Sequence, residues 1–208
     1  MLLLITTPCY DKGTHYLRAW SQPLIADAEK RGVDVKNLDK DETTKEKFQS
    51  YVGKRPVDVI VINGHGNDIA VAGKDNEEII LSVGDGDNLL KDKDVFIRAC
   101  SSGVVLGPSI MKNGAKGFIG YEQDFIVPLD KDSIGRPLED KIAAPILECS
   151  NQIITSLIKG HSVSEAQAAS MKKYEEKFDE LSSSNVATTH ILPFLLWNME
   201  FQVCYPSI

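Results

Sequence analysis

Short apolar runs rich in β-branched residues recur along the chain, and between them the apolar residues keep a helical spacing. The runs predict strands over residues 2–7, 33–38, 57–65, 94–100 and 115–121. The segments between them predict helices over residues 16–31, 40–52 and 104–113. Pro23 lies inside the first of these helices, where it should cause a kink or mark the real start.

This alternation of strand and helix up to residue 121 predicts a three-layer α/β/α sandwich around a mostly parallel sheet. We expect a flavodoxin-like strand order, 2-1-3-4-5, at the core of the sheet. Residues 69–71 and 78–81 flank a turn and predict a β-hairpin, and residues 87–91 predict a single helical turn. The whole chain, 1–208, is expected to form one domain.

The last third of the chain shows a less regular alternation of strand and helix patterns. Residues 122–138, rich in Asp, Pro and Gly, predict a long functional loop. A helix interrupted by Pro145 is expected over 138–158, and a second one over 162–181, where Ser162 and Glu165 form a capping box. The apolar segment 187–205 is compatible with either a helix or a strand.

Composition limits the kinds of molecule that the protein is expected to bind and the cellular compartment in which we expect it. The net charge of −7 provides no basic field for nucleic acid or for an anionic membrane. No apolar run approaches the roughly 18 residues of a membrane span, and the apolar start of the chain is too short for a signal peptide. The four cysteines are scattered and form no C-x-x-C motif, so we expect neither a metal site nor disulfides, and no cofactor. A reducing, cytoplasmic location fits this use of cysteine best.

Two of the predicted strands end in reactive side chains followed by glycine. One run ends at His65 before Gly66, and the other ends at Cys100 with Gly103 close behind. Neighbouring strands lie about 4.8 Å apart, so an imidazole and a thiol at adjacent strand ends can meet. An imidazole that takes the proton of a thiol is the minimum requirement for thiol-based acyl transfer. Either residue alone would more often be structural, whereas the pair in this order predicts a catalytic site.

The glycines and the following helix suggest how such a site could work. The backbone N–H groups of Gly66 and Cys100 are candidates for an oxyanion hole. A Cys close to the start of the helix expected at residue 104 should gain thiolate character from the helix dipole. The residue that orients His65 is left open among Thr6, Thr7 and Cys9.

The motifs Gly64-His65-Gly66 and Arg98-Ala99-Cys100-Ser101-Ser102-Gly103 resemble those of the caspase-like cysteine peptidases of clan CD. This clan includes caspases, metacaspases, legumain, gingipains and clostripain. The Cys-x-Ser-Gly form is similar to metacaspases, and Ala-Cys-x-Ser-Gly is similar to legumain. By element order the resemblance covers residues 1–125.

The resemblance implies an endopeptidase with Cys100 as nucleophile, His65 as general acid and base, and Gly66 and Cys100 as oxyanion donors. It also implies a specificity pocket lined by the loops after the first and fifth strands. Acidic residues in these loops, Asp124 above all, with Glu122 and Asp11 as rivals, predict cleavage after Arg or Lys, although Lys12 leaves room for an acidic substrate residue. The substrate would be a peptide or protein.

The chain also departs from the caspase pattern. Caspases carry Gln-Ala-Cys with the His about 50 residues upstream, whereas here Arg98 precedes Ala99 and the two candidates are 35 residues apart. Caspase specificity for aspartate therefore should not be transferred. The main alternative is a catalytically silent caspase-like interaction or sensor module. A glutamine amidotransferase is disfavoured, because in that class the His follows the Cys.

Overall fold

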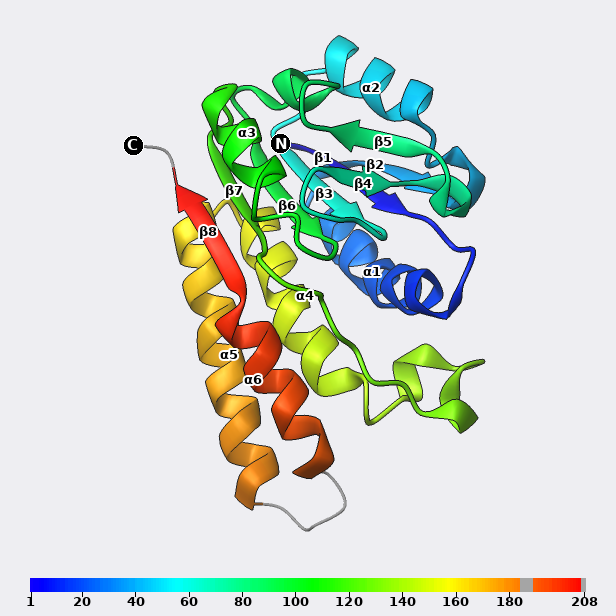
Figure 1. Ribbon diagram of the computed structural model, residues 1–208, viewed down its shortest axis with the longest axis vertical. Helices are drawn as coiled ribbons and strands as arrows, with labels where there is room; N and C mark the ends of the chain where they lie inside the picture. The colour runs from blue at the N-terminus through cyan, green and yellow to red at the C-terminus, as the bar shows by residue number, and fades with distance from the viewer. Residues whose placement is uncertain (184–188, 207–208) are drawn as a thin grey trace.

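A six-stranded sheet with the order β2-β1-β3-β6-β7-β8 forms the centre of the molecule (Figure 1). The computed structural model describes residues 1–183 and 189–206. The strands of this sheet are β1 (Leu2–Thr7), β2 (Asp34–Asp39), β3 (Val59–Asn63), β6 (Asp94–Arg98), β7 (Gly117–Tyr121) and β8 (Gln202–Pro206). All neighbouring pairs are parallel except β7 and β8. The first five strands therefore confirm the predicted order, and an antiparallel strand extends it.

Helices cover both faces of the sheet, which confirms the predicted three-layer sandwich. The α-helices are α1 (Lys12–Lys30), α2 (Lys45–Lys54), α3 (Leu106–Lys112), α4 (Ala144–Ile158), α5 (Val163–Ser183) and α6 (Leu192–Glu200). The predicted hairpin is also present, as the antiparallel strands β4 (Ala70–Ala72) and β5 (Ile79–Ser82). Short 3₁₀ turns lie at Lys40–Glu42, Lys74–Asn76, Asp87–Leu90, Lys131–Ser133, Pro137–Glu139 and Thr189–Ile191.

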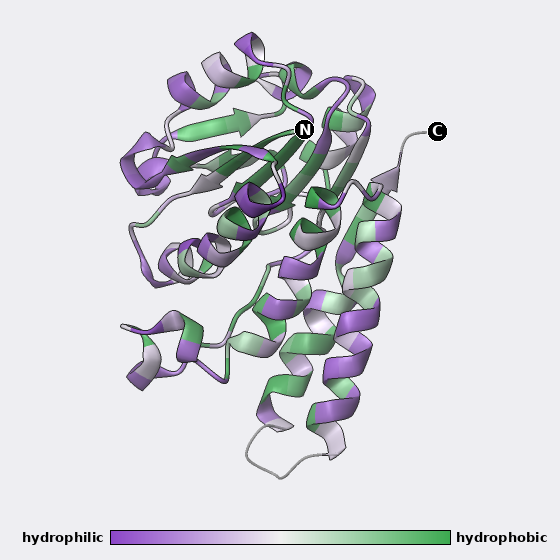
Figure 2. Ribbon diagram, turned by 180° about the vertical axis from the view of Figure 1, so that it is seen from behind, coloured by the Kyte–Doolittle hydropathy of each residue, from purple (hydrophilic) through white to green (hydrophobic). Residues whose placement is uncertain are grey.

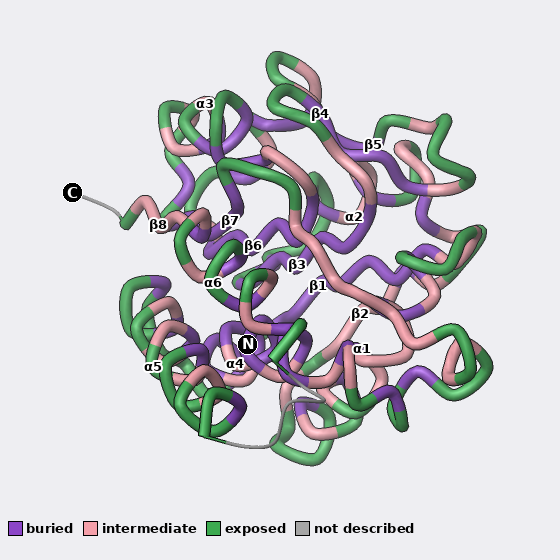
Figure 3. Tube along the Cα trace, turned by 60° about the horizontal axis from the view of Figure 1, so that its bottom comes forward, coloured by how far each residue is buried: buried purple, intermediate pink, exposed green. Residues whose placement is uncertain are grey.

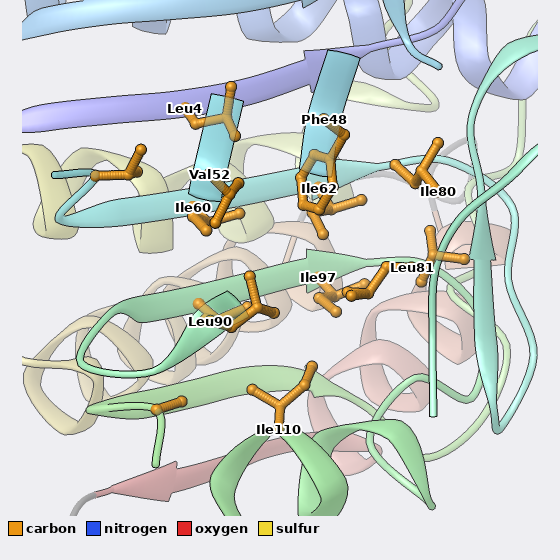
Figure 4. Packing of buried hydrophobic residues seen from close by; sticks show 14 of the residues in the cluster. Leu4, Phe48, Val52, Ile60, Ile62, Ile80, Leu81, Leu90, Ile97 and Ile110 are labelled. Atoms are coloured by element: carbon orange, nitrogen blue, oxygen red, sulfur yellow. The ribbon is translucent and has the colours of Figure 1, made fainter. Parts of the chain in front are cut away.

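Side chains that alternate along each strand build two separate cores. On one face Leu4, Ile60 and Ile97 pack with Phe48 of α2 and with residues of the hairpin and α3 (Figure 4). On the other face, apolar side chains from the same strands, such as Ile5, pack against α1, α4 and α5. Strands that are apolar on both sides are typical of a parallel sheet covered on both faces.

Figure 2 shows the same division by hydropathy, with hydrophobic central strands and polar outer turns of α2 and α5. Figure 3 shows that the central strands are buried along most of their length, whereas the outer helices expose one side. Among the described residues, no helix combines the length and the apolar character that crossing a membrane requires.

Several boundaries differ from the predicted ones for identifiable reasons. The first helix begins four residues early, at Lys12, because Asp11 caps it, and it continues past Pro23. Pro145 stands in the first turn of α4 and so marks its start rather than an interruption. Ser162 and Glu165 form the predicted capping box, with Ser162 N donating to Glu165 Oε2 at 2.8 Å.

The C-terminal segment 187–205, whose apolar pattern suits either a helix or a strand, contains both kinds of element. Its residues 187 and 188 lie outside the described part of the chain, and the remainder forms α6 followed by β8. Helices α5 and α6 lie side by side and extend beyond the sheet, with α4 next to α5 (Figure 1). The last strand returns to pair with β7 along its full length.

Candidate active site

The pairing of β3 with β6 places the two candidate catalytic residues at the same level. Asn63 and Arg98 are direct partners in the parallel ladder, and they are the last residues of their strands. His65 and Cys100 each follow two residues later. Both side chains line one pocket of about 140 Å³ at the carboxyl edge of the sheet. The structure therefore places the two residues at one edge of the sheet, on the lining of the same pocket.

The β4–β5 hairpin packs closely on the chain around His65. A Cβ atom at Gly64 would lie 2.5 Å from the carbonyl oxygen of Ala72, and one at Gly66 would lie 2.9 Å from that of Ala70. The backbone N–H of Ala72 donates to the carbonyl of His65 at 2.9 Å. Glycines on both sides of His65 therefore allow the hairpin to fix the backbone from which the imidazole projects.

The environment of Cys100 favours the neutral thiol. Burial raises the pKa of Cys100, and the nearby carboxylate of Asp124 raises it further, against the lowering effect of the Phe125 backbone N–H. The expected thiolate character from a helix dipole is wrong, because α3 begins only at Leu106. Instead Ser101 adopts a left-handed conformation with φ of 53°, and its N–H donates to the Gln123 carbonyl at 3.0 Å.

A carboxylate holds the imidazole of His65. Oδ2 of Asp11 lies 2.6 Å from Nε2 of His65, and the ring of Tyr10 packs against the imidazole with 6.0 Å between centroids. Burial alone would raise the pKa of Asp11, but hydrogen bonds from Thr14 and His65 outweigh this effect and lower it. Asp11 is therefore ionised at neutral pH.

The three residues considered earlier as orienters of His65 have other partners. Thr6 Oγ1 donates to the Asn63 carbonyl at 3.1 Å, and Thr7 Oγ1 donates to Asn37 and Asp39. The sulfur of Cys9 lies 3.8 Å from Nδ1 of His15. Asp11 takes the position beside His65 instead, because it both ends the loop after β1 and begins α1.

The predicted acidic residues of the specificity pocket do not line this cavity. Asp124 lies close to the Cys100 thiol, and its backbone carbonyl accepts a hydrogen bond from Trp197 at 2.9 Å. The carboxylate of Glu122 accepts from the Tyr205 hydroxyl at 3.4 Å. Apart from His65 and Arg98, the lining is neutral and comprises Gly13, Thr14, Tyr16, Leu17, Gly64, Ala99, Cys100, Phe125, Val127 and Leu129.

Arg98 is a further functional candidate, which in the sequence stands out only as part of the motif that ends at Cys100 and Gly103. Its side chain is fully buried, yet it lines the pocket. Its nitrogens donate to Asn63 at 2.9 Å and to Asn151 at 2.7 Å, with longer contacts to Ser21 and Ser150. These partners are all neutral. A charged residue directly after the apolar run Val95-Phe96-Ile97, in a strand buried throughout, was the signal that could have revealed it.

Groups able to hold a metal are not found in the described residues, where no three His, Cys, Asp or Glu side chains cluster suitably. The four cysteines are not joined in disulfides. The lining brings together the Cys100 thiol, the His65 imidazole and the Arg98 guanidinium, and the Asp11 carboxylate is bonded to the imidazole from outside the lining.

Comparison with known proteins bears on the fold. No protein-family model matches the chain, and no curated protein matches its sequence. Among solved structures, the chain is similar to caspase-1 from Spodoptera frugiperda, with a TM-score of 0.51 and 11% sequence identity. The match covers 99% of this chain and 85% of that chain. The molecule therefore has a caspase-like α/β fold.

Proposed function

We propose that the protein is a cysteine peptidase in which Cys100 is the nucleophile and His65 transfers protons. The observation that carries this proposal is the direct pairing of Asn63 with Arg98, which sets His65 and Cys100 level with each other over one pocket. The caspase-like fold supports the same class of activity by analogy.

The reaction follows the usual course of thiol acyl transfer. The Cys100 sulfur attacks the peptide carbonyl carbon as its proton passes to His65, and the carbonyl oxygen becomes an oxyanion. The N–H groups of Gly66 and Cys100 are the proposed donors to that oxygen. His65 then gives its proton to the leaving amine, which produces a thioester. Water activated by His65 hydrolyses the thioester and restores the thiol.

The charge of the pocket bears on which substrate side chain it accepts. The acidic residues Asp124, Glu122 and Asp11 predict a preference for Arg or Lys. Arg98 weighs against it, because a buried guanidinium at the wall of the pocket repels a second cation. Burial lowers the pKa of Arg98 to about 10, which still leaves it charged at neutral pH.

An acidic side chain fits this wall better than a basic one. Buried charges are normally compensated by an opposite charge, and the hydrogen-bond partners found for Arg98 supply none. The Arg98 side chain is fully buried, so a carboxylate entering the pocket would provide that compensation through the attraction of opposite charges rather than through direct hydrogen bonds. We therefore favour cleavage after Asp or Glu over cleavage after Arg or Lys.

A panel of fluorogenic peptides ending in Asp, Glu, Leu, Asn, Arg or Lys tests both parts of the proposal. Wild-type protein should cleave the acidic peptides at least about 10-fold faster than the basic ones. Cleavage should disappear in Cys100→Ala and persist in Cys204→Ala, which removes another half-buried thiol.

The opposite outcomes are equally informative. Faster cleavage of the Arg and Lys peptides would restore the original specificity prediction. If the folded protein cleaves no peptide and Cys100 resists alkylation while other thiols react, the silent interaction module becomes the better description.

A further inference from the structure

We propose that Asp11 is a positioning residue that selects the tautomer of His65, an inference that rests on the proposed peptidase function. Oδ2 of Asp11 lies 2.6 Å from Nε2 of His65, a distance typical of a charge-assisted hydrogen bond. The acceptor is an ionised carboxylate, so the proton of this bond belongs to Nε2. Nδ1 is then the nitrogen left without a proton, free to accept one from a thiol.

The position of Asp11 is fixed by the helix that it caps. Its other oxygen, Oδ1, accepts from the backbone N–H of Thr14 at 2.8 Å and from the Thr14 hydroxyl at 2.7 Å. In return the Thr14 hydroxyl accepts from the backbone N–H of Asp11 at 3.1 Å. One carboxylate oxygen is thus held by a 19-residue helix while the other holds the imidazole.

Tyr10 and Gly13, which flank Asp11 in the sequence, also lie against the imidazole of His65. The Tyr10 ring packs at 6.0 Å between centroids and an interplanar angle of 48°. A Cβ atom at Gly13 would lie 3.9 Å from Cε1 of His65. The imidazole is therefore bounded by Tyr10, Asp11 and Gly13, which are close in sequence, and the backbone of His65 is held separately by β4.

The hydrogen bond between Asp11 and His65 matters because the thiol of Cys100 is protonated at neutral pH. Because burial raises the pKa of Cys100, its thiol needs a base with a free lone pair on the pocket side. The carboxylate of Asp11 also stabilises the imidazolium that forms when the proton is transferred. The side chains of Asp11 and His65 are 42% and 43% exposed, so solvent moderates the effect.

Replacing Asp11 by Asn separates its charge from its capping role. Asn is as good an N-cap as Asp, so Asp11→Asn should keep the thermal stability of α1 while removing the carboxylate. Asp11→Ser is a second variant of the same kind, and Asp11→Ala removes both roles. Thr44→Ala, which removes the N-cap of α2 far from His65, controls for loss of a cap alone.

The first measurement is the tautomer of His65, read from the ring nitrogen shifts in ¹⁵N NMR at a pH where the ring is neutral. The His65 signals are assigned by their loss in His65→Gln. We expect a dominant Nε2–H form in the wild type and in Thr44→Ala. In Asp11→Asn the amide oxygen takes over the cap and the NH2 group faces Nε2, so we expect the Nδ1–H form to gain population; in Asp11→Ser we expect a mixture of tautomers. An unchanged Nε2–H form in both Asp11 variants would overturn the proposal.

The second measurement is steady-state kinetics with the best peptide of the panel. In Asp11→Asn, kcat should fall about 10-fold or more with KM nearly unchanged, because the carboxylate acts on the proton transfer rather than on binding. A wild-type kcat in this variant would contradict the positioning role. If the wild type cleaves no peptide, the peptidase proposal fails, whereas the tautomer measurement still decides the role of Asp11.

Discussion

Cys100 shows at the scale of single residues how neighbours set the reactivity of a thiol. Burial and the charge of Asp124 both raise its pKa, while the backbone N–H of Phe125 acts in the opposite direction. At neutral pH the thiol therefore keeps its proton until a base removes it. This is the reason that His65, and the carboxylate behind it, matter for the proposed activity.

Asp124→Asn should make Cys100 more reactive at neutral pH. The carboxylate disfavours the thiolate, so its removal lowers the pKa of the thiol and moves the midpoint of the alkylation profile to lower pH. The rate of iodoacetamide labelling of Cys100 between pH 6 and pH 10, followed by peptide mass mapping, measures this shift. Glu122→Gln is the control, since that carboxylate contacts Tyr205 instead. An unchanged midpoint in Asp124→Asn would show that this carboxylate does not contribute to the pKa of Cys100.

The sequence was sufficient to predict that His65 and Cys100 follow neighbouring strands, because both come after apolar runs and are followed by glycines. It did not indicate the hydrogen bond between Asp11 and His65; for Asp11 the sequence predicts a place in the substrate pocket. Thr14 stands three residues after Asp11, and this capping pattern was the available signal that Asp11 begins a helix. The partners of Arg98 come from residues 21, 63, 150 and 151, and only the folded chain brings such distant residues together.

At the scale of single elements, local capping residues determine where a helix begins, and packing against other segments determines whether an apolar stretch forms a helix or a strand. The capping box of Ser162 and Glu165 was readable from sequence because all of its contacts are local. The C-terminal segment was not, because short apolar stretches suit either a helix or a strand. There, contact with α5 selects the helix α6, and pairing with β7 selects the strand β8.

Ser162→Ala tests the contribution of this cap to stability. Loss of the hydroxyl leaves the Glu165 N–H without its 3.3 Å partner, and we expect the free energy of unfolding to fall by about 1 kcal/mol. Urea denaturation followed by far-UV circular dichroism measures the change. Ser182→Ala, an exposed position near the other end of α5, should change it by less than about 0.5 kcal/mol. Equal effects of the two substitutions would argue against a capping contribution.

At the scale of the whole molecule, the predicted sandwich and the order of the first five strands are confirmed. The alternation of strands and helices carries that information because parallel strands require crossover connections. The sixth strand and the two helices α5 and α6 depend on contacts between distant segments, such as Tyr121 with Gln202 across β7 and β8. Those contacts leave no periodic pattern in the sequence.

The long connection between β7 and α4, residues 122–143, is held to the rest of the molecule by hydrogen bonds near both of its ends. Near its start, Asn198 makes hydrogen bonds to the N–H and the carbonyl of Ile126, at 3.0 and 2.7 Å. Near its end, the buried carboxylate of Asp140 accepts from Tyr16 at 2.7 Å and from the backbone N–H of Asp130 at 2.9 Å. Between these points Gly135 is exposed, and a Cβ atom placed there would touch nothing.

Chain continuity at Gly135 should therefore be dispensable for the native assembly. If a specific protease site is inserted there and cut, we expect two bands on a denaturing gel but one species of unchanged size on native size-exclusion chromatography. Fragments that separate without denaturant would show that the backbone link is needed. The second fragment supplies β8 to the sheet that the first fragment begins, and it also supplies the helices α4, α5 and α6. The molecule could therefore also be produced as two separate polypeptides that assemble while folding.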